Sequence, residues 1–212
     1  MWSYLDRQVR SVGSYIIPDR DGLDVCDGRA EYGERVVQPA SLGLPGSGLS
    51  EDPNLTVVAE PAARALRELL DAWRSWPKVG RLPRRASFDP VDFPRLLPWM
   101  LLYELDRHPN RYRNYDLRYR YVGTAVADTL QSRGLTGTYL SALPDPFPER
   151  WFPTFDRVRE TAAPMVVRGK PYLVDKTYLK FEMLYLPLAR NEPADPDEVG
   201  FNLLCMHQEP VR

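Results

Sequence analysis

The sequence predicts an α+β domain: one five-stranded antiparallel sheet with helices on one side, and an N-terminal helix before it. Two strand-forming segments, 99–106 and 116–122, flank a polar tip and predict a β-hairpin. Three more strand candidates close the chain with no helix between them, which requires antiparallel pairing. Helical segments separate the two groups of strands, so these helices should gather on one face of a single sheet. This layout leaves room for a cavity between the sheet and the helices.

The first quarter of the chain is predicted to lie outside this domain. Residues 1–55 are expected to form an arm and linker, and residues 56–212 the domain. Segment 1–17 has the apolar spacing of a short helix, whereas segment 41–54 carries the glycine, serine and proline of a linker.

Residues 60–76 predict an amphipathic helix. Pro61 suits its first turn, and apolar residues recur on one face. This stripe consists of Ala62, Leu66, Leu69, Leu70, Trp73 and Trp76. Packing of the stripe on the sheet is the simpler expectation, because most helical stability comes from burying such a face. The alternative is a dimer contact through part of it, since two tryptophans offer a large apolar area.

Prolines mark the ends of the short segments that precede the hairpin. Asp89 can cap a short turn that begins at Pro90. Pro98 favours an extended residue before it, so the strand 99–106 should start there. The return strand alternates apolar or aromatic residues with arginine over 117–122, the period of a strand with two different faces.

The segment after the hairpin predicts two helices. Thr124 can cap a helix over 125–133, and Gly134 can end it in the left-handed conformation. A second helix is expected over 148–163, with Pro153 bending it or delaying its start. The closing strands are predicted at 164–168, 172–189 and 198–207.

Composition excludes several classes of partner. The net charge of −1 and a pI near 6.2 predict neither a nucleic-acid nor a membrane partner. No apolar run approaches the roughly 20 residues of a membrane span, and the N-terminus lacks the pattern of a signal peptide. Cys26 and Cys205 stand far apart, outside any metal-binding spacing, which suits a reducing, cytoplasmic compartment.

Two long segments, FDPVDFPRLLPWMLLYELD and LRYRYVGTAVADTLQSRGLTGTYL, resemble the PAS family. More specifically, they resemble bacterial stand-alone PAS proteins of an uncharacterised subfamily. The shared features are a proline-bounded Leu-Leu-Pro, an Arg-x-Arg-x-Val-Gly-Thr strand end, a Thr-Gly-x-Tyr-Leu, and the run from Glu182 to Leu188. The resemblance covers about residues 60–208.

The resemblance implies a sensory or regulatory module without an output domain, binding a small ligand, a protein partner or a second copy. Flavin photoreceptors of the family carry a reactive cysteine, and no cysteine lies between Cys26 and Cys205. Haem-binding members use a histidine from the helical segment, and residues 109–206 contain none. The resemblance therefore implies neither flavin nor haem, and what remains is an unknown small ligand or no ligand.

Candidate ligand-binding residues lie on the predicted strands and helices around the cavity. They are Arg118, Arg120, Tyr121, Tyr139, Trp151, Phe155, Glu182, Met183, Tyr185 and Asn202. The two arginines share one strand face; solvent exposure is the simpler expectation, and clamping a carboxylate or phosphate is the alternative. Glu182 sits among apolar residues and is expected to pair with one of the two arginines.

A small-molecule enzyme on a related α+β fold is the alternative function. Glu182 and a tyrosine would then do acid–base work. A nucleophile with an adjacent base, a glycine-rich phosphate loop and a zinc-binding motif are all missing from the sequence. No catalytic or metal-binding residue is therefore assigned.

Overall fold

The computed structural model describes residues 55–130, 132, 134–144, 146–169 and 179–210. The arm expected over 1–55, with its helix at 1–17, falls almost wholly outside the described residues.

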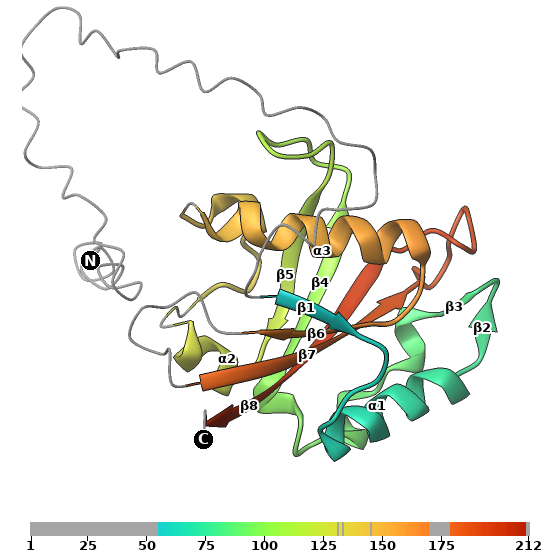
Figure 1. Ribbon diagram of the computed structural model, residues 1–212. Coiled ribbons are helices and arrows are strands. Elements are labelled where there is room, and N and C mark those ends of the chain that lie inside the picture. The colour runs from blue at the N-terminus through green and yellow to red at the C-terminus, as the bar shows by residue number, and fades with distance from the viewer. Residues whose placement is uncertain (1–54, 131, 133, 145, 170–178, 211–212) are drawn as a thin grey trace, which may run out of the picture.

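One six-stranded sheet forms the centre of the domain, and all its neighbouring strands are antiparallel (Figure 1). Its order is β1-β6-β7-β8-β4-β5. The strands are β1 (Leu55–Val58), β4 (Met100–Asp106), β5 (Asp116–Val122), β6 (Met165–Gly169), β7 (Leu179–Leu188) and β8 (Phe201–Pro210). The predicted α+β architecture is confirmed, including the position of β4 between β5 and β8.

Strand β1 is the element that the sequence analysis missed. It has four residues, Leu55–Val58, and pairs with β6 at the edge of the sheet. Leu55 is buried, whereas Val57 is exposed. A four-residue edge strand directly after a linker-like segment carries too short an alternation for a period-two pattern to reveal it.

Helices cover both faces of the sheet. The N-terminal helix α1 (Arg64–Ser75) packs on one face through Leu66, Leu69 and Leu70. The helices α2 (Thr124–Thr129) and α3 (Phe147–Thr161) lie on the other face, where α3 crosses in front of the strands in Figure 1. The apolar stripe of α1 thus packs on the sheet.

Trp73 fixes the far end of α1. Its side chain is 4% exposed, and its indole N–H donates a hydrogen bond of 2.9 Å to the carbonyl oxygen of Pro187 in β7. Trp76 is partly buried and packs against Phe88 and Phe93. Trp73 is therefore a core residue, and a dimer contact through part of this helix, the alternative given above, remains a prediction.

Short elements connect α1 to β4. They are β2 (Lys78–Val79), β3 (Leu82–Pro83), η2 (Arg85–Ser87), η3 (Pro90–Asp92) and η4 (Leu97–Trp99), and a further turn, η5 (Leu140–Ala142), precedes α3. Asp89 caps η3 as predicted, its carboxylate accepting a hydrogen bond from the N–H of Val91 at 2.9 Å.

Three details of the helix ends differ from prediction. Gly123 occupies the cap position of α2, and Thr124 is the first helical residue with no capping bond from its side chain. Pro153 lies inside α3, which starts at Phe147 without delay. Gly134 adopts the predicted left-handed conformation, with φ of 77°, but α2 ends at Thr129, so this glycine does not end the helix.

The two strands of the β4–β5 hairpin change register between Leu102 and Tyr103. Tyr103 pairs with Tyr119, but Leu102 pairs with Tyr121, so β5 carries one extra residue, Arg120. Such a bulge turns the following side chains to the opposite face. The strict alternation predicted over 117–122 therefore ends at Arg120.

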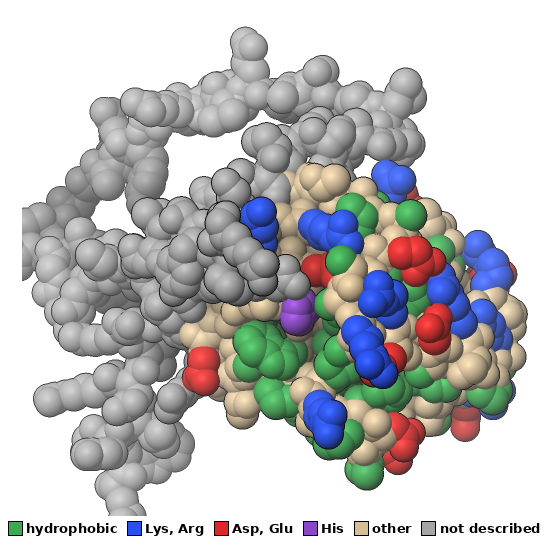
Figure 2. All heavy atoms as spheres, turned by 60° about the horizontal axis from the view of Figure 1, so that its bottom comes forward, with side chains coloured by type: hydrophobic (Ala, Val, Ile, Leu, Met, Phe, Trp, Pro, Cys, Tyr) green, Lys and Arg blue, Asp and Glu red, His purple; other side chains and the backbone are tan. Residues whose placement is uncertain are grey.

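The surface of the α1 side is mixed in charge. Figure 2 shows acidic and basic side chains interspersed over it, and exposed ion pairs such as Arg64–Glu68 and Arg74–Glu60 lie there. Among the described residues, no helix is long and apolar enough to cross a membrane.

Candidate functional site

A cavity of about 90 Å³ lies between the sheet and the helices α2 and α3. Its lining is almost entirely apolar and comes from both sides. The residues are Leu101, Tyr103, Val126, Thr129, Leu130, Phe147, Trp151, Phe155, Phe181, Met183, Tyr185, Leu204, Met206 and Gln208. The space is large enough for several water molecules, since one water needs a cavity of roughly 10–15 Å³.

The floor of the cavity is one face of the sheet. Alternate residues of β7, namely Phe181, Met183 and Tyr185, point to it, because successive side chains of a strand point to opposite faces. In register beside them, Leu204 pairs with Tyr185 and Met206 with Met183. The antiparallel pairing thus aligns the cavity-facing residues of two long strands.

Aromatic side chains of α3 form the roof. Phe155 makes edge-to-face contacts with Tyr103 and Tyr185, at ring-centroid distances of 5.0 and 5.5 Å. Trp151, one turn earlier, lies 6.1 Å from Phe181. These tilted arrangements favour aromatic attraction and leave ring edges and faces toward the cavity.

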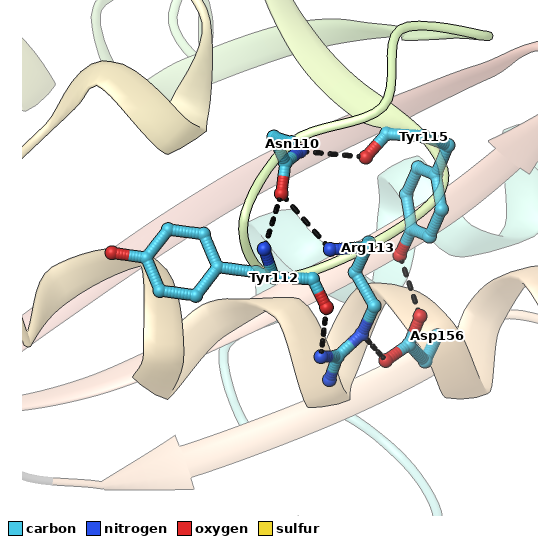
Figure 3. Close-up of polar contacts among 5 residues, drawn as sticks. All are labelled: Asn110, Tyr112, Arg113, Tyr115 and Asp156. Carbon is cyan, nitrogen blue, oxygen red and sulfur yellow. Dashed lines mark hydrogen bonds and ion pairs between the residues drawn. The ribbon is translucent and has the colours of Figure 1, made fainter.

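The tip of the β4–β5 hairpin holds α3 in place, and Asn110 orders that tip (Figure 3). The side-chain oxygen of Asn110 accepts hydrogen bonds from the N–H groups of Tyr112 and Arg113, at 2.7 and 2.9 Å. Its amide group donates one of 2.8 Å to the carbonyl oxygen of Tyr115. One side chain thereby closes the turn between the two strands.

Asp156 of α3 then binds this ordered tip. Its carboxylate accepts hydrogen bonds from Nε of Arg113 at 2.6 Å and from the hydroxyl of Tyr115 at 2.8 Å. Phe152, on the same helix, packs against the ring of Tyr115. Trp151 directly precedes Phe152 in the helix, and Phe155 directly precedes Asp156. The contacts of Phe152 and Asp156 therefore also position the cavity roof.

The mouth of the cavity carries most of its half-exposed residues. Thr129 ends α2 and Leu130 follows it, Phe147 starts α3, and Gln208 lies near the end of β8. The Nε2 of Gln208 donates a hydrogen bond of 3.1 Å to the hydroxyl oxygen of Thr129. A polar contact between helix and sheet thus lies among the half-exposed residues that line the apolar space.

Electrostatically, the cavity is neutral. None of the described residues that line it is an acid, a lysine, an arginine or a histidine. Burial raises the pKa of Tyr103 well above its ordinary value, and burial likewise raises the pKa of Tyr185. Both hydroxyl groups therefore stay protonated at neutral pH.

The structure brings four of the ten predicted site residues to this cavity. These are Trp151, Phe155, Met183 and Tyr185. Six do not line it: Arg118, Arg120, Tyr121, Tyr139, Glu182 and Asn202.

The hairpin bulge accounts for the positions of Arg120 and Tyr121, whereas Arg118 lies before it in regular register. Arg120, the extra residue, lies 3.5 Å from a carboxylate oxygen of Glu104 in an ion pair. Tyr121 is 38% exposed and donates a hydrogen bond to the carbonyl oxygen of Leu97. Arg118 lies over the ring of Tyr139 at 5.9 Å.

Tyr139 lies at the outer edge of β5 rather than under the helices. Its hydroxyl donates a hydrogen bond of 2.9 Å to Asp106. Asn202 does lie on the cavity side of β8, opposite Tyr103, but it is 1% exposed and stays behind the lining residues.

Glu182 lies on the face of β7 that carries α1. One carboxylate oxygen accepts hydrogen bonds from Nε of Arg168 at 2.7 Å and from the N–H of Ala62 at 2.8 Å. The other accepts one from the N–H of Ala63 at 2.9 Å. Glu182 thus pairs with an arginine, as expected, but its partner is Arg168 and not Arg118 or Arg120.

Burial alone would raise the pKa of Glu182, but the two backbone N–H groups and Arg168 outweigh it and lower that pKa. The carboxylate is fully engaged in anchoring the chain before α1. It lies on the opposite side of the sheet from the cavity, so it offers no base to a molecule bound there. This placement removes the support for the enzymatic alternative.

Ten lining residues were not among the predicted site residues. Several, such as Leu101, Leu204 and Met206, are identified only by strand register, because aliphatic strand residues look alike on either face. Gln208 and Thr129 could be recognised only through their contact across the fold. Over the described residues, no group of three or more histidine, cysteine or acidic side chains is arranged to hold a metal ion.

Comparison with known proteins gave one family match. The sequence model described as "PAS domain" matches residues 62–202, about two thirds of the chain. Searches of curated proteins and of solved structures found no match.

Proposed function

The chain belongs to the PAS domain family, and on that premise we propose that it is a sensory module whose cavity binds a small ligand. The observation that carries this proposal is the cavity of about 90 Å³ between the sheet and the helices. Interiors are normally packed with few voids larger than a water molecule, so an apolar space of this size is a candidate binding site.

Strand β7 offers a route from the cavity to the opposite face. Phe181 and Met183 face the cavity, and Glu182 between them holds the start of α1. A ligand that shifts this part of β7 would also shift the carboxylate to which α1 is bound. Ligand binding can bias such an arrangement only as far as it prefers one state over the other.

A homodimer or protein partner is the proposed receiver of this signal. In this proposal, the outer surface of α1 and its neighbouring turns change position when the cavity fills. Light scattering of the purified protein, with and without a ligand identified by co-purification, measures whether its oligomeric state changes when the ligand binds.

Co-purification tests the proposal without choosing a ligand in advance. Protein expressed in cells is purified, and the small molecules released on denaturation are identified by mass spectrometry. We expect a compound that is present at one molecule per protein chain, or one whose addition raises the melting temperature of the protein. At a hundredfold excess over its Kd, such a ligand stabilises the folded state by about 2.7 kcal/mol.

The control is Leu204→Phe, which adds a ring from the floor into the cavity. Its preparation should lack the compound. Equal recovery of the compound from wild type and Leu204→Phe would show that it binds elsewhere and would contradict the proposal.

A further inference from the structure

The chemistry of the cavity lining restricts what can bind there. Fourteen described residues line the space, and all of them are uncharged. A charged group taken out of water into such surroundings loses its hydration and gains no opposite charge from the lining residues, which costs far more than burying a neutral group does. The lining therefore discriminates by charge before it discriminates by shape.

The size of the cavity sets a second limit. At about 90 Å³ it is of the same order as the engineered apolar cavity of roughly 150 Å³ that accepts benzene in another protein. Six of the lining side chains are aromatic: Tyr103, Phe147, Trp151, Phe155, Phe181 and Tyr185. Their edges and faces are suited to contact a further ring.

Polar groups are few, and two of them lie at the mouth. Gln208 and Thr129 are half-exposed and already contact each other, whereas Tyr103 and Tyr185 lie deep in the lining. A ligand with one neutral polar group can therefore bury its apolar body and direct that group to the mouth or to a tyrosine hydroxyl.

Arg150 is a cation close to the roof, and it does not line the cavity. Its guanidinium lies 5.3 Å from the centre of the Trp151 ring, and its charge acts on Tyr185. If the cavity took an anion, Arg150 would be its natural partner, so this residue provides a direct control.

We propose that the cavity accepts neutral, mainly apolar molecules about the size of one aromatic ring and discriminates against ions of that size; this rests on the proposed sensory function. The charge-free lining, the cavity volume and the aromatic roof carry the inference together.

Three matched probes test it at pH 7: benzyl alcohol, benzoate and benzylammonium. They share one ring and differ in charge. Binding is measured by calorimetry and by amide chemical shifts of ¹⁵N-labelled full-length protein. We expect benzyl alcohol to bind with shifts along β7 and α3, and each ion to bind at least roughly 100-fold more weakly.

Leu204→Phe should abolish binding of benzyl alcohol by filling the space. Leu203→Phe is its matched control, because Leu203 is the neighbouring residue on β8 and faces the other side of the sheet. Should Leu203→Phe fail to fold, the amide shifts of wild type still locate the probe.

Benzoate could instead bind as tightly as benzyl alcohol and be weakened by Arg150→Gln. That result would overturn the inferred discrimination against ions, while the cavity would still bind a ligand. Failure of all three probes would overturn the inferred ligand class alone, because the co-purification experiment tests the sensory function with no assumed ligand. Benzyl alcohol binding that survives Leu204→Phe would place the probe outside the cavity and would also overturn the inference.

Discussion

Glu182 and Arg168 face each other across the β6–β7 pair, with 2.7 Å between the carboxylate oxygen Oε1 and the guanidinium Nε. The same carboxylate binds the N–H groups of Ala62 and Ala63, residues about 120 positions earlier in the chain. A strand residue thus anchors the segment that leads into α1. Charge-assisted bonds of this kind are among the stronger ones in proteins.

Glu182→Gln should lower the free energy of unfolding by about 2 kcal/mol, because an amide cannot accept all three hydrogen bonds and leaves Arg168 without its counter-charge. Urea denaturation measures the change. The matched control is Glu68→Gln, which breaks an exposed pair with Arg64 and should cost less than about 0.5 kcal/mol. Equal effects of the two substitutions would contradict the anchoring role.

The stabilisation by Glu182 should depend on pH. Burial opposes ionisation, but Ala62, Ala63 and Arg168 outweigh it, so the pKa of Glu182 in the folded protein is below its ordinary value. A group with a lowered folded pKa stabilises the fold above its unfolded pKa and loses that contribution as the pH falls through the folded pKa. The stability difference between wild type and Glu182→Gln should therefore be full at pH 7 and shrink in acid. A difference that grows in acid would show the opposite sign of shift.

Asp156→Asn should loosen the contact between the hairpin tip and α3. The substitution removes the charge that holds Arg113 and one of two acceptors, so we expect a loss of about 1–2 kcal/mol. Asp71→Asn makes the same change in α1, where the pair with Arg74 is exposed, and should be nearly neutral. Hydrogen exchange should also quicken at Tyr112 and Arg113 in Asp156→Asn only. Unchanged exchange there would show that the tip does not depend on Asp156.

The sequence predicted those elements whose cause is local. Alternation and proline punctuation located β4 and β5, and the order of elements predicted antiparallel pairing. Asp89 and Pro90 formed their predicted turn, because a cap involves only neighbouring residues. Features that depend on contacts between distant segments were not predictable in this way.

In the candidate site, too, local patterns identified some residues, and contacts between distant segments decided the others. Trp151 and Phe155 were identified because helical periodicity puts them on one face. Tyr121 was misplaced because a bulge at Arg120 inverts the strand, and a bulge leaves no mark in an alternating sequence. The partner of Glu182 was misassigned because β6 lies beside β7, and only the sheet register shows which arginine is opposite.

Gly123 explains part of the Arg-x-Arg-x-Val-Gly-Thr strand end in physical terms. Its φ of −65° is open to any residue, so the need for glycine is steric. A Cβ at this position would collide with the backbone of Leu97 and Pro98 in η4. The N–H of Gly123 also donates a hydrogen bond of 2.8 Å to the carbonyl oxygen of Met100. This close approach at Gly123, three residues before Val126 at the cavity wall, sets the start of α2.

Gly123→Ala should therefore lower the free energy of unfolding by about 3 kcal/mol or more, because two backbone segments must separate. Gly134→Ala is the matched control: nothing lies near its added methyl group, and only the positive φ of 77° opposes it, at about 1–2 kcal/mol. Urea denaturation ranks the two, and benzyl alcohol affinity reports on the cavity wall. We expect Gly123→Ala to weaken this binding and Gly134→Ala to leave it unchanged. If Gly123→Ala cost no more than Gly134→Ala, the close packing of η4 against the end of β5 would not be what requires glycine there.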